Sequence, residues 1–250
     1  MRIIVQNLAI EYEDRGTGPV MLFLHGWKDD LHTFDALAPT FVGSWRIILL
    51  DLPGFGKSEL LPNAWGLTEY VLFVQVFLEK LKVSPAVIVG HSFGGRILIK
   101  GLAMNVFEVQ KAVLVASAGV AKLKTTRSLF FGAVAKFGKL VTVIPPFYFW
   151  RNTLRKKLYS LIGSDYFQAG ALKETFLKVV REDLSLDAKK IAIPVLLVWG
   201  SLDTETPLSD AQKFARLIQG ATLQVYEGTG HFVHREKATE VAQRIKHFVE

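Results

Sequence analysis

The chain has 250 residues, with 30 Lys and Arg against 23 Asp and Glu, a formal net charge of +7, and half of its residues are hydrophobic. A composition this apolar excludes an intrinsically disordered chain, and the length predicts one large domain with or without an insertion. Because the sequence has no cysteine, disulfides, thiolate catalysis and Cys-ligated metal or iron–sulfur sites are excluded.

The hydropathy pattern argues against export and against a membrane span. The apolar run after Arg2 ends within three residues, which is too short for the hydrophobic region of a signal peptide. A membrane span needs about 20 consecutive apolar residues, and the longest apolar stretch, 140–150, is interrupted by Pro145 and Pro146. We therefore expect a cytoplasmic protein without an integral membrane segment.

Short apolar runs alternate with segments of helical periodicity along most of the chain. The N-terminal runs predict a hairpin, and the continuous run Val20–Leu24 is typical of a strand that is buried on both faces of a parallel sheet. Strands are predicted at 3–6, 8–12, 20–24, 46–50, 86–89, 112–115, 195–199 and 222–226, and helices at 33–41, 68–81, 96–104, 209–217 and 236–248. This alternation predicts an α/β fold with a mostly parallel eight-stranded sheet flanked by helices.

One long segment interrupts this alternation. From about Ala121 to Leu186 the sequence is helix-like and gives no strand signal, and it is too long for a plain loop in a compact domain. We expect an inserted helical cap over 121–188, which divides the core into 1–120 and 189–250.

The basic excess of the chain falls in this predicted insertion. Residues 121–190 contain fourteen Lys and Arg against five Asp and Glu, a balance of +9, whereas the rest of the chain has a balance of −2. Two interpretations stay open: a solvated helix face, or a surface that makes weak contact with anionic substrates or anionic lipid surfaces. We do not expect the protein to bind nucleic acid.

The segment Gly90-His91-Ser92-Phe93-Gly94 has the pattern G-x-S-x-G between a predicted strand and a predicted helix. A serine hydroxyl becomes a useful nucleophile only when it is exposed beside a base, and a sharp strand-to-helix turn exposes it. The helix that follows directs its N-terminal N–H groups toward the same place. Taken alone, the pattern also fits a glycine-rich turn with an uninvolved serine.

Two further polar residues follow predicted strands. Asp203 comes just after the run 195–200, and His231 follows the last strand in the segment Gly228-Thr229-Gly230-His231. The carboxyl ends of parallel strands share one edge of the sheet, where active sites form. Ser92, Asp203 and His231 are therefore predicted to meet there.

With these motifs the sequence resembles the α/β-hydrolase superfamily, in its branch of capped serine esterases and hydrolases. The matching segments are 25–27, 51–58, 90–95, 199–203 and 228–231. The resemblance implies that Ser92 is the nucleophile, that His231 is the general base and then the acid, and that Asp203 orients His231. It also implies an oxyanion hole made by the backbone N–H groups of Trp27 and Phe93, whose side chains are then free to line the substrate pocket.

Other candidates are assigned lesser roles. His234 is the rival base but lacks the preceding Gly-Thr-Gly turn, and Glu205, the rival carboxylate, is expected to be a solvated loop residue. Asp51 matches a family loop whose role is structural. His25 is expected to brace the loop that carries Trp27, and His91 to point away from the nucleophile.

The sequence argues against several other chemistries. Lys57-Ser58 does not fit the spacing of a phosphate-binding loop, and no His, Asp and Glu cluster has metal-ligand spacing, so we expect no metal and no cofactor. Relatives of this fold that open epoxides or remove halogens have Asp where this chain has Ser92.

The resemblance thus implies cleavage of carboxylic esters with small to medium apolar acyl groups through an acyl-enzyme on Ser92. Three reactions with the same three residues stay open: C–C bond hydrolysis of β-diketone-type ring-fission products, lactone hydrolysis and peracid formation. A ligand-binding protein of this fold without catalysis is a further alternative.

Overall fold

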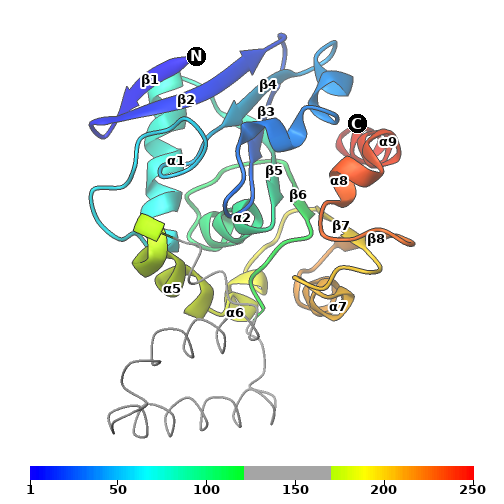
Figure 1. The fold of residues 1–250 in the computed structure, drawn as a ribbon. Helices are drawn as coiled ribbons and strands as arrows, with labels where there is room; N and C mark the ends of the chain where they lie inside the picture. Colours follow the sequence, from blue (N-terminus) through cyan, green and yellow to red (C-terminus); the bar gives the residue numbers. More distant parts are fainter. Residues whose placement is uncertain (121–169) are drawn as a thin grey trace, which may run out of the picture.

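An eight-stranded sheet organises the computed structural model, which describes residues 1–120 and 170–250 (Figure 1). The strands are β1 (Arg2–Val5), β2 (Leu8–Arg15), β3 (Val20–Leu24), β4 (Arg46–Leu50), β5 (Pro85–His91), β6 (Lys111–Val115), β7 (Val195–Gly200) and β8 (Ala221–Tyr226). Their order across the sheet is β1-β2-β4-β3-β5-β6-β7-β8. β2 pairs antiparallel with both β1 and β4, and every other pairing is parallel, which confirms the predicted mostly parallel sheet.

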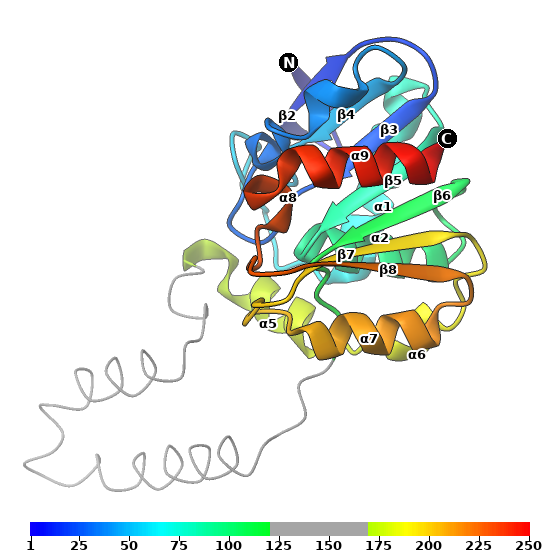
Figure 2. The same ribbon diagram turned by 90° about the vertical axis from the view of Figure 1, so that its right-hand side faces the viewer.

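Helices cover both faces of this sheet. α1, α2 and α7 pack on one face, and the two short 3-10 helices η1 and η2 pack with α9 on the other (Figures 1 and 2). The described helices are η1 (Leu31–Phe34), η2 (Ala38–Phe41), α1 (Leu67–Leu81), α2 (Phe93–Ala103), η4 (Gly170–Leu172), α5 (Lys173–Arg181), α6 (Ser185–Ala188), α7 (Leu208–Leu217), α8 (Val233–Glu236) and α9 (Ala238–Val249). None of them is long and apolar enough to cross a membrane.

The central strand β3 shows why its sequence is apolar throughout. Leu22 and Leu24 belong to the core on the α1 and α2 side, while Met21 and Phe23 belong to the core on the α9 side. Alternate side chains of a strand point to opposite faces, so a strand covered by helices on both faces has no solvent-facing position. Burying each large apolar side chain contributes about 1.5–3 kcal/mol.

The prediction of one helix at 33–41 is wrong. Two 3-10 helices take its place, and the first begins earlier because the Asp30 carboxylate caps it by accepting the N–H of His32. Pro39 lies in the first turn of the second helix, where it has no N–H to continue the hydrogen bonding of a longer helix. The last helix also differs, since α8 precedes α9 and the two are separated at Lys237, whose φ is −129°.

Most of the predicted insertion, residues 121–169, lies outside the described residues. Its described end, which contains η4, α5 and α6, is fastened to α2. The Arg96 guanidinium donates to the carbonyl of Val179 at 2.6 Å, and the Lys100 ammonium pairs with Glu182 at 2.7 Å. Burial lowers the pKa of Arg96 to about 10, although the Glu182 carboxylate opposes that shift. The segment that leads into β7 therefore packs against the helix that follows Ser92.

Candidate active site

Ser92 occupies a strained backbone position between β5 and α2. Its φ of 49° and ψ of −103° lie where residues with a side chain are rarely found. Such a conformation costs about 1–3 kcal/mol and persists only when the surroundings impose it. Here the Ser92 N–H donates to the Val115 carbonyl at 3.0 Å, and the Ser92 carbonyl accepts the N–H groups of Arg96 and Ala118, both at 3.2 Å.

The two glycines of the motif are required by close backbone contacts. A Cβ at Gly94 would lie 2.1 Å from the carbonyl oxygen of Leu24, and one at Gly90 would lie 2.7 Å from the backbone of Gly94. Neither neighbour can move without distorting the sheet or the helix. The motif thus specifies the sharp turn that the sequence predicts.

Asp203 and His231 form a direct pair at the same edge of the sheet. The Nδ1 atom of His231 lies 2.8 Å from Oδ2 of Asp203, and both side chains are buried. Asp203 also accepts the Thr206 N–H at 2.9 Å and the Thr206 hydroxyl at 2.8 Å. Burial works to raise the pKa of Asp203, but these hydrogen bonds and the His231 ring lower it overall. A ring whose single proton sits on Nδ1 donates it to this carboxylate and has a lone pair at Nε2.

The loop that carries His231 is fixed on both sides. A Cβ at Gly200 would lie 2.3 Å from the carbonyl oxygens of Thr229 and Gly230, so β7 and this loop pack backbone to backbone. The Glu236 carboxylate of α8 accepts the N–H of Gly230 at 3.0 Å. The position of the imidazole is therefore set by the adjoining strand and helix.

The Nε2 atom of His231 has an unexpected neighbour. Within the described part of the chain, no hydrogen bond joins Ser92 to this ring, and Nε2 instead lies 3.5 Å from Oε2 of Glu205. Catalytic hydrogen bonds are often long before substrate binds. Glu205 is 62% exposed, as expected of a loop carboxylate, but it contacts the ring of His231 rather than solvent alone.

The backbone N–H groups of Trp27 and Phe93 are both available at this edge. Neither donates a hydrogen bond to any described residue, and Phe93 is the first residue of α2, where helical N–H groups have no partner within the helix. The Gly94 N–H donates to the carbonyl of His25 at 3.0 Å, which joins the loop after β3 to the turn at Ser92.

His25 braces this loop, as the sequence predicts. Its Nδ1 lies 2.7 Å from the Gly26 carbonyl, and its Nε2 accepts the Leu52 N–H at 3.0 Å. Asp51 has the structural role expected of it, because its carboxylate accepts the backbone N–H groups of Leu31 at 2.7 Å and Lys57 at 2.8 Å.

The side chains of Trp27 and Phe93 differ in their surroundings. The Trp27 ring is half-buried and lies 5.3 Å from the ring of Phe93, 4.9 Å from Phe55 and 5.2 Å from Phe176. Phe93 is 2% exposed and packs edge-on against Tyr70 in the core. These aromatic rings form an apolar wall beside the loop that carries Trp27.

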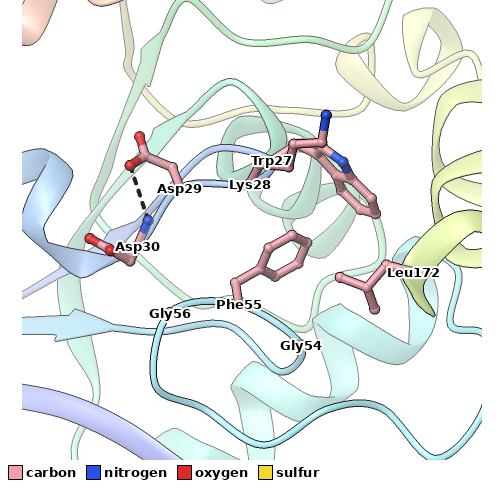
Figure 3. A pocket seen from close by; sticks show the side chains of 8 residues that line it. All are labelled: Trp27, Lys28, Asp29, Asp30, Gly54, Phe55, Gly56 and Leu172. Atoms are coloured by element: carbon pink, nitrogen blue, oxygen red, sulfur yellow. Dashed lines mark hydrogen bonds between the residues drawn. The ribbon is translucent and has the colours of Figure 1, made fainter. Parts of the chain in front are cut away.

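A pocket of about 290 Å³ lies beside the same loop, next to Trp27 (Figure 3). Its lining residues are Trp27, Lys28, Asp29, Asp30, Gly54, Phe55, Gly56 and Leu172. Trp27, Phe55 and Leu172 give it an apolar side, and the segment 28–30 gives it a polar side. Ser92, Phe93 and His231 do not line it, so it is adjacent to the predicted site rather than above the serine.

His91 and His234 form a buried layer against His231. Their rings lie 4.4 Å apart, and Nε2 of His91 is 3.2 Å from the His231 carbonyl. Burial, followed by the neighbouring charged groups, lowers the pKa of His91 well below its usual range and that of His234 to about 3. Nε2 of His234 lies 2.9 Å from the Thr33 hydroxyl rather than near a carboxylate, which weighs against His234 as the base.

Within residues 1–120 and 170–250, no group of three or more His, Asp and Glu could hold a metal ion.

Arg235 connects the loop after β3 to α8, and no sequence motif singles it out. Its guanidinium donates to both carboxylate oxygens of Asp29, at 2.8 and 2.9 Å, and to the Thr33 hydroxyl at 2.7 Å. The same group lies 4.7 Å from the centre of the Phe232 ring. Asp29 follows Trp27 by two residues and Arg235 follows His231 by four. This proximity in sequence to two predicted site residues is the one signal by which Arg235 could have been found.

The fold and this constellation define the class of the protein. The chain belongs to the alpha/beta hydrolase family, whose model matches residues 21–244. An uncharacterised hydrolase of Bacillus subtilis, YugF, is 26% identical over 97% of this chain and 94% of its own length. A non-heme chloroperoxidase of Streptomyces lividans is 29% identical over 89% of both chains.

Solved structures agree with this assignment. An esterase from Exiguobacterium antarcticum superposes with a TM-score of 0.76 at 22% identity, over 99% of this chain and 98% of the esterase. A meta-cleavage product hydrolase from Pseudomonas fluorescens superposes with a TM-score of 0.75 at 21% identity, over 99% of this chain and 96% of that hydrolase. At these identities the likeness establishes the fold alone.

Proposed function

We propose that this alpha/beta hydrolase is a serine hydrolase that cleaves carboxylic esters with small to medium apolar acyl groups. The observation that carries the proposal is the 2.8 Å pair between Asp203 and His231, at the sheet edge where Ser92 occupies its strained turn. An oriented imidazole and a serine hydroxyl at one edge of the sheet are the two groups that nucleophilic catalysis by serine requires.

In the first half of the reaction, Nε2 of His231 takes the hydroxyl proton of Ser92 while the oxygen attacks the ester carbonyl carbon. The carbonyl electron pair moves to the oxygen, and the backbone N–H groups of Trp27 and Phe93 bind the resulting oxyanion. When this tetrahedral intermediate collapses, the bond to the alcohol oxygen breaks, and the alcohol leaves with the proton from Nε2. The ionised Asp203 stabilises the imidazolium throughout.

In the second half, water replaces the alcohol. Nε2 takes one proton from the water as its oxygen attacks the acyl-enzyme, and the same proton returns to Ser92 as the carboxylic acid is released. In each half the imidazole accepts one proton and then donates it, so one oriented ring can serve both halves.

Two features support an apolar acyl group and a covered site. Trp27, Phe55 and Phe176 form an aromatic wall beside the oxyanion N–H groups. We also propose that 121–188 is the inserted cap of this hydrolase, because its described end is fastened to α2 by Arg96 and Lys100.

A panel of p-nitrophenyl esters of increasing chain length tests the proposal. We expect turnover that is greatest for short to medium chains and is lost in Ser92→Ala. A lactone, a β-diketone and an ester with added hydrogen peroxide belong in the same panel, because they report the three alternative reactions. Ester turnover at the wild-type rate by Ser92→Ala would refute the proposal.

A further inference from the structure

Glu205 places a carboxylate at the reacting nitrogen of the predicted base. Its Oε2 lies 3.5 Å from Nε2 of His231, on the opposite side of the ring from Asp203. The backbone N–H of Glu205 donates to Oδ1 of Asp203 at 2.9 Å, which anchors the residue in the loop after β7. Two carboxylates therefore flank one imidazole, a buried one at Nδ1 and an exposed one at Nε2.

The departing alcohol must pass this position if the proposed function is correct. A general acid protonates its leaving group from a distance of about 2.6–3.2 Å. The alcohol oxygen then lies within hydrogen-bonding distance of Nε2, and the next few atoms of the alcohol come close to the Glu205 carboxylate. The acyl group is attached to the carbonyl carbon instead of the alcohol oxygen, so this argument concerns the alcohol part of the ester.

The charge beside the leaving alcohol is negative. Among the described residues, no Lys or Arg pairs with Glu205, and its carboxylate contacts the His231 ring, which carries a charge only when it is protonated. The positive charge of Arg235, four residues after His231, is paired with Asp29 at 2.8 Å. The Asp203 carboxylate is buried and lies 2.8 Å from Nδ1 of His231.

We propose that Glu205 is a specificity-determining residue that selects esters whose alcohol part carries a positive charge and disfavours those whose alcohol part is anionic. This inference rests on the proposed function, because it assigns the alcohol side of the same reaction. The carboxylate is 62% exposed, so its effect is that of a solvated ion pair, about 1.5- to 5-fold in kcat/KM. Screening at about 1 M salt, where the Debye length is about 3 Å, should remove most of this preference.

Two esters that differ only in charge provide the test. Both carry the same short acyl group; one is the ester of choline, and the other is the ester of its uncharged carbon isostere, in which a tert-butyl group replaces the trimethylammonium. We expect the wild-type protein to favour the choline ester in kcat/KM by about 1.5- to 5-fold. In Glu205→Gln the ratio should fall toward one. A third ester, of an alcohol that ends in a carboxylate, should gain from the same substitution.

Glu108→Gln is the matched control, because Glu108 is exposed and precedes β6 at the opposite end of the strands. It should keep the wild-type ratio. A ratio that is the same in the wild-type protein and in Glu205→Gln overturns the inference, provided that a phosphonate probe labels Ser92. Failure of that labelling overturns the proposed function, and this inference with it.

Discussion

Arg235 and Asp29 form an ion pair across 206 residues of sequence, in which one guanidinium nitrogen, Nη2, donates to both carboxylate oxygens at 2.8 and 2.9 Å. The pair joins the loop that carries Trp27 to the helix that follows His231. Oxyanion donors and a general base contribute to the rate only when they hold their positions relative to each other, and a displacement of about 1 Å can cost about 100-fold. We therefore expect the pair to hold these two segments of the predicted site in position.

Arg235→Ala should lower kcat/KM by about 10- to 100-fold, mainly through kcat, because it releases one loop from the other. Steady-state kinetics with a p-nitrophenyl ester measure the effect. Arg46→Ala is the control, since Arg46 also forms an ion pair with an aspartate: its Nε and Nη2 donate to Asp14 at 2.9 and 2.7 Å, at the start of β4. Equal losses of activity in the two variants would contradict a positioning role.

Asp203→Asn should lower kcat by about 10⁴-fold. The amide can donate to Nδ1 of His231, which moves the ring proton to Nε2 and removes the lone pair that accepts the hydroxyl proton. Stopped-flow measurement of the acylation burst checks this directly. A burst of unchanged rate would mean that Asp203 does not orient the ring.

Gly94→Ala should destabilise the fold by about 1–3 kcal/mol or more, because the added methyl group would lie 2.1 Å from the Leu24 carbonyl oxygen. Gly43→Ala is the matched control, since a Cβ there meets no atom within 4 Å. Urea denaturation of both variants gives the two free energies of unfolding. Similar values for the two would contradict the close packing of β3 against α2.

The buried histidines predict a loss of stability in mild acid. Burial lowers the pKa of His25, His91 and His234 in the folded protein, to about 3 for His234. Below the ordinary value of 6.5, the unfolded chain takes up protons that the folded protein does not, so the free energy of unfolding falls as the pH decreases toward 3. Each such histidine contributes up to about 1.4 kcal/mol per pH unit.

The dependence of the free energy of unfolding on pH reflects the protons taken up on unfolding. His234→Asn should reduce that uptake by about one proton. Urea denaturation between pH 7 and pH 4 measures it, with the pH 8 value as the reference for any direct destabilisation by the variant. An unchanged slope in His234→Asn would contradict the buried, neutral state of this ring.

The strands were predictable because their signal is local. The bounds of β3 and β4 coincide with the predicted strands 20–24 and 46–50, which are apolar throughout after Arg46, since strands buried on both faces leave no polar position inside them. The turn at Ser92 was predictable for a related reason, because only glycine fits at 90 and 94. The interrupted segment 31–41 was not, since Pro39 sits within a pattern of helical periodicity.

The contacts of Glu205 and Arg235 could not be predicted, because each depends on how two distant loops meet. The sequence places Glu205 two residues after Asp203, but only the path of the loop turns its carboxylate toward Nε2 of His231. The pairing of Arg235 with Asp29 likewise needs the relative position of α8 and the loop after β3.

Covalent labelling with a fluorophosphonate probe tests the central claim most directly. We predict that the wild-type protein takes up one probe per chain, that peptide mass spectrometry finds it on Ser92, and that ester turnover falls in proportion to labelling. Ser92→Ala should take up none. Labelling of another residue together with loss of turnover, or full ester turnover in a protein labelled at Ser92, would contradict the assignment of Ser92 as the nucleophile.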